Sequence, residues 1–159
     1  MAVLLDEMLK RTASWCRVLG IDTRFITGKS DTWLLAYAKK ERLVLVTRDT
    51  ELFGRCLKQG VQCVFLKSDE REEQIAQIVR DAKEAMTFPE RTRCPKCNGE
   101  LALVEAASVK DEVPESVAGA QRKFWKCPSC GKVYWEGSHW KNITRVHERV
   151  KALLEQPQG

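Results

Sequence analysis

Long hydrophobic runs are absent from this sequence. No stretch approaches the roughly 18 apolar residues that a membrane-spanning helix needs. The apolar start, Val3 to Leu5, is interrupted by Asp6 and is too short for the hydrophobic segment of a secretory signal. Low-complexity tracts are missing as well. We therefore expect a protein that contacts no membrane and is located in the cytoplasm.

A recognisable covalent nucleophile and a disulfide framework are also missing. Ser14 and Ser138 have no base at a familiar spacing, which argues against a serine nucleophile. The seven cysteines are an odd number, which suits a reducing compartment better than a set of paired disulfides. Three of them, Cys16, Cys56 and Cys63, lie in apolar segments and are predicted to be small core residues.

The other four cysteines form two Cys-Pro-x-Cys pairs. Cys94 and Cys97 make the first pair, and Cys127 and Cys130 make the second. In each pair a tight turn directs two thiolates at one ion, and two pairs complete the tetrahedral set that Zn²⁺ prefers. Turn-forming asparagine or glycine residues follow both pairs. The spacing predicts a zinc ribbon with one structural zinc ion.

The zinc ribbon divides the chain. A length of 159 residues has room for one ordinary domain and a small appendage. A segment of about 45 residues builds too little core to fold alone, so zinc must supply much of its folding free energy, on the order of 10 kcal/mol. We expect a first domain at 1–87, a linker at 88–93, the ribbon at 94–140, and a C-terminal helix and tail at 141–159.

The first domain alternates short apolar runs with amphipathic stretches. Predicted strands and helices follow in the order 3–5, 7–19, 23–26, 31–40, 43–46, 50–58, 63–66 and a helix containing Ile75, Ile78 and Val79. This alternation predicts the α/β class, with a parallel sheet that carries helices on both faces. In the second part, the polar segment 105–121 is expected to be a long loop, and 142–155 the final helix.

Positive charge is concentrated in the second part of the chain. Residues 91–159 carry 12 basic and 8 acidic side chains, a net of +4, whereas residues 1–90 carry 15 and 14, a net of +1. A basic ribbon and tail suit a polyanion such as RNA, because phosphate contacts by lysine and arginine drive non-specific binding. Many basic proteins bind no nucleic acid, so the charge alone leaves the partner open.

Three aspartates lie where the predicted parallel sheet would bind a ligand. Asp6 follows the first strand, Asp49 follows the third, and Asp31 begins the helix after the second. The carboxyl ends of parallel strands form the ligand-binding edge. Converging carboxylates repel each other unless a cation compensates, and Mg²⁺ or Mn²⁺ prefers such oxygen ligands. A divalent ion there can promote phosphodiester hydrolysis. The alternative for Asp31 and Asp49 is a role as helix N-caps.

The motifs around these residues resemble a known family. They are Asp6-Glu-Met-Leu, Leu19-Gly20, Asp22-Thr23, Ser30-Asp31, Thr47-Arg48-Asp49, Cys94-Pro-x-Cys-Asn-Gly, Phe124-Trp125-x-Cys-Pro-x-Cys-Gly and Tyr134-Trp-x-Gly-Ser-His-Trp140. Over about residues 1–145 the sequence resembles the Mut-7 C-terminal (Mut-7-C) RNase domain family. The resemblance implies a PIN-like nuclease fold fused to a zinc ribbon, with metal-dependent hydrolysis of RNA.

The resemblance also implies roles for individual residues. Asp6, Asp31 and Asp49 match the acids that are catalytic and hold Mg²⁺ or Mn²⁺ in PIN-like nucleases. Many such nucleases have a fourth acid, for which Asp69 is the candidate, with helix capping as its alternative. Glu7 and Glu51, next to two of the acids, are further candidates.

Contacts with RNA, expected to be single-stranded, have three candidate residues. Arg48 lies between strand and acid, where it can approach a phosphate, or it is a solvated loop arginine. His139 and Trp140 belong to an aromatic segment of the ribbon that can stack on unpaired bases. The alternative is that these aromatic residues form the small core of the ribbon.

A different class of function stays open at this stage. The chain can instead be a non-catalytic RNA- or ribosome-binding protein that keeps a degenerate acidic cluster, since fold alone does not establish activity. Residues 7–14, next to the first acid, depart from the family pattern in a way that suits this alternative. A toxin-like nuclease that requires a protein partner is a third hypothesis.

Overall fold

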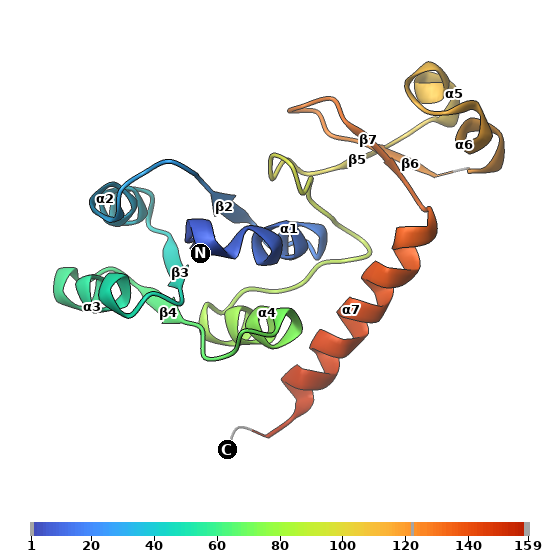
Figure 1. Cartoon of the computed structure of the whole chain (residues 1–159). Coiled ribbons are helices and arrows are strands. Elements are labelled where there is room, and N and C mark those ends of the chain that lie inside the picture. Colours follow the sequence, from blue (N-terminus) through green and yellow to red (C-terminus); the bar gives the residue numbers. More distant parts are fainter. Residues whose placement is uncertain (1, 122, 158–159) are drawn as a thin grey trace.

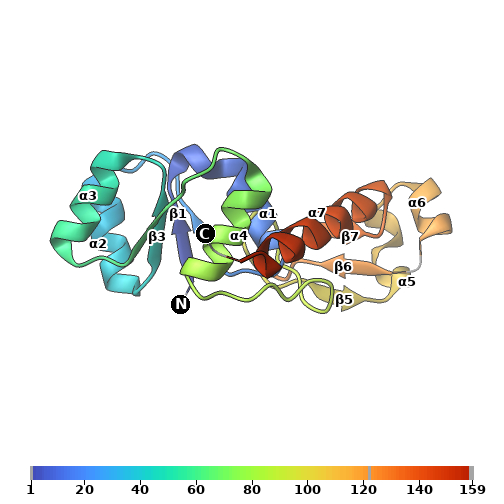
Figure 2. The same ribbon diagram turned by 90° about the horizontal axis from the view of Figure 1, so that it is seen from below.

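The computed structural model describes residues 2–121 and 123–157, which form two parts joined by a long helix (Figure 1). A four-stranded parallel sheet with its helices makes the first part, and a three-stranded antiparallel sheet makes the second. Helix α7 (Ser138–Glu155) leaves the second part and runs back along the first (Figures 1 and 2). In the described ranges, no helix is both long and apolar enough to cross a membrane.

The parallel sheet has the strand order β2-β1-β3-β4. Its strands are β1 (Val3–Leu5), β2 (Thr23–Phe25), β3 (Val44–Thr47) and β4 (Cys63–Phe65). The two central strands, β1 and β3, are buried along their whole length. Continuous apolar runs of this kind suit strands that are covered on both faces. The four strands lie within a residue or two of the predicted ranges.

Side chains of the central strands alternate between two cores, as the pleat of a strand requires. Val3 and Leu5 pack in one cluster with helices α1 (Lys10–Val18) and α4 (Arg71–Asp81). Leu4 and its neighbour Leu45 pack in the other cluster. This second cluster is covered by α2 (Asp31–Glu41) and α3 (Thr50–Gln59). The predicted α/β class, with helices on both faces of a parallel sheet, is therefore confirmed.

Helix boundaries follow the capping residues of the sequence. A short 3₁₀ turn, η1 (Glu7–Leu9), leads into α1, so the predicted helix at 7–19 has a tighter first turn. After α1, Gly20 adopts φ +95°, and a side chain there would collide with the Thr87 hydroxyl. Gly60 ends α3 in the left-handed region. Glycine is favoured at both positions because a Cβ is disfavoured at positive φ.

The ribbon contains an antiparallel sheet and more helix than expected. Its strands, in sheet order, are β5 (Ala102–Val104), β6 (Phe124–Lys126) and β7 (Val133–Trp135). The prediction of a long loop at 105–121 is wrong, because this segment forms α5 (Ala106–Val109), η2 (Lys110–Glu112) and α6 (Glu115–Ala120).

Valine side chains explain these short helices. Val109 is buried, and Val113 and Val117 pack beside it, so one valine in every four residues covers the ribbon sheet at Phe124. Because polar residues surround these valines, their regular spacing was not recognised in the sequence. The ribbon thereby has a small core of its own.

The C-terminal helix completes the core of the first part. Helix α7 starts four residues earlier than the predicted 142 and ends as expected at 155, while the last two residues of the predicted tail lie outside the described residues. Val146 and Val150 are buried in the same cluster as Val3 and Leu5. Phe88, in the segment predicted as a linker, is buried there too.

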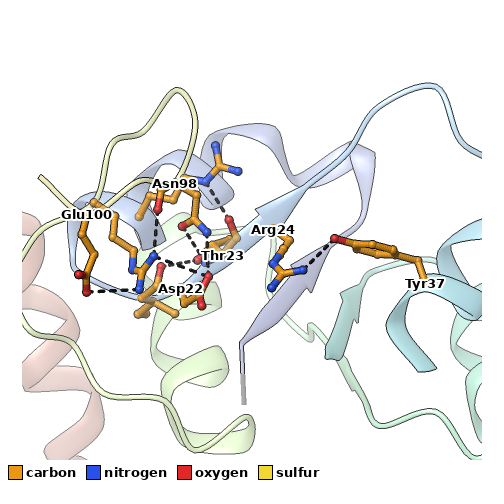
Figure 3. A network of polar contacts seen from close by, with 9 residues as sticks. Asp22, Thr23, Arg24, Tyr37, Asn98 and Glu100 are labelled. Atoms are coloured by element: carbon orange, nitrogen blue, oxygen red, sulfur yellow. Dashed lines mark hydrogen bonds and ion pairs between the residues drawn. The ribbon is translucent and has the colours of Figure 1, made fainter. Parts of the chain in front are cut away.

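Asn98, which follows the first cysteine pair, is hydrogen-bonded to the start of β2 (Figure 3). The Asn98 side chain accepts from the Thr23 backbone N–H at 3.0 Å and donates to Asp22 Oδ1 at 2.7 Å. The buried Arg17 donates from Nε to the Thr23 carbonyl and from Nη1 to the Pro95 carbonyl, both at 2.9 Å. Because these bonds satisfy buried backbone groups, they hold the ribbon in one position on the parallel sheet.

We predict that Val150→Ala lowers the free energy of unfolding by about 2 kcal/mol, because it leaves a cavity in the core shared by α7 and the parallel sheet. Urea denaturation followed by circular dichroism measures the change. Leu57→Ala is the matched control, since the Leu57 side chain is 64% exposed, and it should change the stability little. Equal effects of the two variants would mean that α7 does not stabilise the first part.

Candidate active site and zinc centre

The first and third aspartates meet at the centre of the parallel sheet. Asp6 directly follows β1, and Asp49 follows β3 after one intervening residue. These strands are neighbours, and their onward connections lead to opposite edges of the sheet, towards β2 and β4. In open α/β sheets such a switch point is where ligands bind. The strand order thus brings together two residues that are 43 positions apart in the sequence.

A buried threonine connects the Asp6 carboxylate to the backbone of Asp49. Thr47 Oγ1 donates to Asp6 Oδ2 at 2.8 Å and accepts from the Asp49 backbone N–H at 3.0 Å. Asp6 Oδ1 accepts from the Glu7 backbone N–H at 2.8 Å. Since both Asp6 oxygens are held by the protein, its carboxylate has a fixed orientation. The connecting role of Thr47 was not predicted from the sequence, although its place at the end of β3, two residues before Asp49, was a usable signal.

Asp49 also caps a helix. Its Oδ1 accepts from the backbone N–H groups of Glu51 at 2.8 Å and Leu52 at 3.2 Å, at the start of α3. The capping alternative is therefore present in the structure. Both bonds use one oxygen, and a carboxylate has about four acceptor sites, so capping leaves Asp49 able to bind a cation.

Asp31 does not cap α2. Ser30 is the N-cap, and its Oγ accepts from the Trp33 backbone N–H at 3.1 Å. Burial raises the pKa of Asp31, and the charges of Asp6 and Asp49 raise it further. The charges of Asp6 and Asp49 therefore act on Asp31, and a cation at this edge would offset that unfavourable interaction.

The three aspartates do not form a closed set of ligands. Among residues 2–121 and 123–157, a group of three or more potential ligand atoms within 4.8 Å of one another occurs only at the four cysteines. The acids share one edge of the sheet, but their oxygens stand further apart than direct coordination of one ion by all three requires. Because Mg²⁺ usually keeps several of its waters, a bound water can fill such a gap.

The other acidic candidates occupy different places. Glu7 Oε1 accepts from the Gly28 backbone N–H at 2.9 Å, so it holds the loop before α2. The charge of Glu51 contributes to the raised pKa of Asp31. Asp69 does not cap α4, because the N-cap position is Glu70. It lies instead in a groove beside Arg48.

The candidate RNA contacts fall in two separate places. Arg48 lines the groove next to Asp69, whereas His139 and Trp140 line a cavity of about 430 Å³ between the ribbon, α1 and α7. The Trp140 ring stacks on Trp125 with ring centres 5.0 Å apart and also contacts Phe88 at 5.1 Å. One face of Trp140 is therefore already occupied by protein.

The four predicted zinc ligands converge. The sulfur atoms of Cys94, Cys97, Cys127 and Cys130 all lie within 4.8 Å of one another. Cys94 and Cys130 are separated by 3.7 Å between sulfurs, and Cys97 and Cys127 by 3.3 Å. A tetrahedron with Zn–S bonds of about 2.3 Å places its sulfurs roughly 3.8 Å apart. The donor set and its spacing fit a zinc ion.

The two cysteine turns have the same backbone construction. The Asn98 N–H donates to the Cys94 carbonyl, and the Gly131 N–H donates to the Cys127 carbonyl, both at 2.8 Å. Asn98 and Gly131 adopt positive φ values of 73° and 79°. These turn residues are the ones that follow each cysteine pair in the sequence. Their left-handed conformation lets the chain turn back so that both thiols of a pair face one ion.

Tyr134 contacts one of the four clustered cysteines. Its hydroxyl lies 3.0 Å from Cys94 Sγ. Burial and the bond to Cys94 raise the pKa of the Tyr134 phenol, so it stays protonated and donates to the sulfur. Such a bond orients the ligand and tunes its charge.

We predict that Tyr134→Phe weakens zinc binding by on the order of tenfold, because the Cys94 sulfur loses its hydrogen bond. Competition with a chromogenic chelator measures the affinity. Tyr37→Phe is the matched control, since the Tyr37 hydroxyl bonds to Arg24 and not to a cysteine. Equal zinc affinity in the Tyr134 variant and the wild type would contradict the supporting role.

We predict that Asp31→Asn raises Tm at pH 7 in buffer without divalent ions other than the bound zinc. The folded-state pKa of Asp31 lies above 3.8, so ionisation costs stability as the pH rises through this window. At low pH the carboxyl is protonated in both states, and the gain from asparagine should disappear. Differential scanning fluorimetry at pH 7 and at a pH below 3.8 tests this, with the exposed Asp111→Asn as control. A lower Tm at pH 7 would contradict the proposed repulsion.

Comparison with known proteins gives one match. A family model described as the Mut7-C RNAse domain matches residues 1–147 of the 159-residue chain. Searches of curated proteins and of solved structures found no match. The matched range includes the parallel sheet, the acidic edge, all four clustered cysteines and the first half of α7. The model describes an RNase domain, so the match indicates a nuclease function. The chain belongs to the Mut7-C RNAse domain family.

Proposed function

We propose that this protein hydrolyses the phosphodiester bonds of RNA, with Asp6, Asp31 and Asp49 holding Mg²⁺ or Mn²⁺. The observation that carries the proposal is the link from Asp6 through Thr47 to Asp49 at the switch point of the sheet. The family match supports RNA as the substrate class. The raised pKa of Asp31, which is caused first by burial and then by the charges of Asp6 and Asp49, supports a cation among the three acids.

The donor set fits a hard divalent ion, because all three candidates offer carboxylate oxygens. When bound, such an ion activates water and stabilises the charge that develops on the phosphate oxygens. Asp6 supplies the most rigid ligand, because both of its oxygens accept hydrogen bonds from the protein. Asp49 is held by the first turn of α3. Asp31, without a capping bond, has the most freedom to complete the site.

The zinc ion in this proposal is structural. Its four cysteine ligands form a complete tetrahedral set, which leaves no open position for substrate. Its role is to fold the ribbon, which is fastened to the parallel sheet through Arg17 and Asn98. We propose that the ribbon helps hold single-stranded RNA, with His139 and the free edge of Trp140 as contacts and Arg48 as the contact beside the acids.

A non-catalytic RNA-binding protein is the second candidate function. The observation that favours it is the spacing of the acids, since the three aspartates do not come within 4.8 Å of one another as a set in the described part of the chain. In this case the acidic edge would retain its fold without turnover.

We predict that the purified, zinc-loaded protein cuts a labelled single-stranded RNA only when Mg²⁺ or Mn²⁺ is added. Asp6→Asn and Asp49→Asn should each reduce the rate by at least about 100-fold, since each removes a charged ligand and keeps its shape. Asparagine is also a good N-cap, so Asp49→Asn preserves the start of α3. A denaturing gel follows the cleavage.

The control variant is Asp111→Asn, which removes an exposed carboxylate of the ribbon and should cut like the wild type. Chelators that would strip the ribbon of zinc are avoided, and the metal-free arm uses resin-treated buffer instead. If folded, zinc-loaded wild type binds RNA but does not cut it with either metal, the non-catalytic function replaces the nuclease.

A further inference from the structure

A groove lined by positive charge lies beside the acidic edge. It has a volume of about 550 Å³ and runs between the start of α1, the turn after β3 and the start of α4. Its charged residues are Lys10, Arg11, Arg48, Arg71 and Asp69. Four cations face one carboxylate, so the lining has a net formal charge of +3. The whole chain of 159 residues has a net charge of only +5, so this is a strong local concentration.

Three of the four cations are available to a ligand. Arg71 is already engaged, because it pairs with Glu72 at 2.6 Å and lies over the Trp15 ring at 4.5 Å. Within residues 2–121 and 123–157, the side chains of Lys10, Arg11 and Arg48 make no ion pair with an acid.

Arg48 and Arg71 each have a side-chain donor without a partner. The Nε atoms of both are buried and have no hydrogen-bond partner among the described residues. A buried donor without a partner is costly, and native structures usually supply one from protein, solvent or ligand. An anion in the groove would satisfy the Arg48 donor.

The floor of the groove is rigid. Thr12 and Gln74 are both 5% exposed, and the Thr12 hydroxyl donates to Gln74 Oε1 at 2.5 Å. Gln74 Nε2 in turn donates to the Ser68 carbonyl at 2.9 Å. These bonds tie α1, α4 and the segment before α4 together. The cations above them therefore stand on a fixed frame, which lowers the ordering cost of binding.

The groove and the acidic edge are continuous along the chain. Arg48 is the one residue between Thr47 and Asp49, which form the hydrogen-bonded link to Asp6. On the other side, η1 leads from Asp6 to Lys10 within a single turn. A polyanion that reaches the acids therefore meets the cations next.

We propose that this groove binds one internal phosphodiester of the RNA strand, adjacent to the phosphodiester that lies at the aspartates. The proposal rests on the proposed nuclease function for the placement of the neighbouring phosphate. A cationic groove with protein walls concentrates positive potential and attracts phosphate. Arginine is suited to this role because its guanidinium binds two phosphate oxygens at once. The groove thereby sets which phosphate of the strand reaches the acids.

The test measures RNA binding without cleavage. Asp6→Asn serves as the parent protein, zinc-loaded and in buffer without Mg²⁺ or Mn²⁺. Fluorescence anisotropy with a labelled single-stranded 12-nucleotide RNA gives the affinity at several salt concentrations. Arg11→Gln and Arg48→Gln should each weaken binding on the order of tenfold and lower the salt slope by about 0.7, the value for one contact with a single strand. Arg11→Lys should retain the salt slope, because it keeps the charge.

The matched control is Arg145→Gln, which removes an exposed cation of α7 outside the groove and should leave the affinity within about twofold of the parent. Binding within twofold of the parent by both groove variants would overturn the proposal. Equal weakening by Arg145→Gln would also overturn it, since it would indicate general surface charge. Zinc content and circular dichroism establish that each variant is folded.

A second measurement locates the phosphate. In a series of RNAs, one phosphate at a time is replaced by a neutral methylphosphonate. At one internal position the replacement should weaken binding to the parent protein. At that position the replacement should not weaken binding to Arg11→Gln any further, because the variant has already lost the contact. Affinity that depends on a 5′-terminal phosphate instead would overturn the internal assignment. None of these binding measurements requires cleavage, so the two proposals can fail separately. If the wild type does not cut RNA, the nuclease function is contradicted. Weaker binding by the groove variants would still support the groove as a phosphate site.

Discussion

The pairing of β1 with β3 in the middle of the parallel sheet is the constraint on which the acidic edge depends. It places the residue after β1 next to the turn after β3, so that Thr47 can bond to Asp6 and Asp49 together. Both strands are fully buried, and their side chains anchor two separate cores. A change in their register would therefore disrupt both cores as well as the site.

Acidic and basic side chains lie close together at this edge of the sheet, but they face different sites. The carboxylates of Asp6 and Asp49 point into hydrogen bonds with Thr47 and the first turn of α3, whereas Arg48, between Thr47 and Asp49, lines the neighbouring groove. Separation of this kind allows a cation and a phosphate to bind side by side. Direct pairing of Arg48 with an acid would instead satisfy both groups within the protein and leave less for a ligand.

The ribbon that carries the four clustered cysteines is attached at both ends to the part of the chain that carries the acids. At its start, Arg17 and Asn98 tie the first cysteine turn to β2, and at its end, α7 buries Val146 and Val150 in the main core. The ribbon therefore resembles an insertion between two parts of one core more than an independent appendage. If the four cysteines hold zinc, its removal is expected to disturb β2 as well, because Asn98 belongs to the turn of the first cysteine pair.

The sequence by itself determined the elements whose signals are local. Apolar runs marked the strands, capping residues marked most helix ends, and the Cys-Pro-x-Cys spacing marked a four-cysteine cluster that the structure brings within 4.8 Å. The helices at 105–121 were not predicted, because their packing depends on a few widely spaced valines and not on a continuous amphipathic pattern. Tertiary structure alone decided that Thr47 joins Asp6 to the turn that carries Asp49, and that Lys10 and Arg48 share a groove. These facts depend on contacts between segments far apart in the chain, which strand order and helix packing create and which no local pattern records.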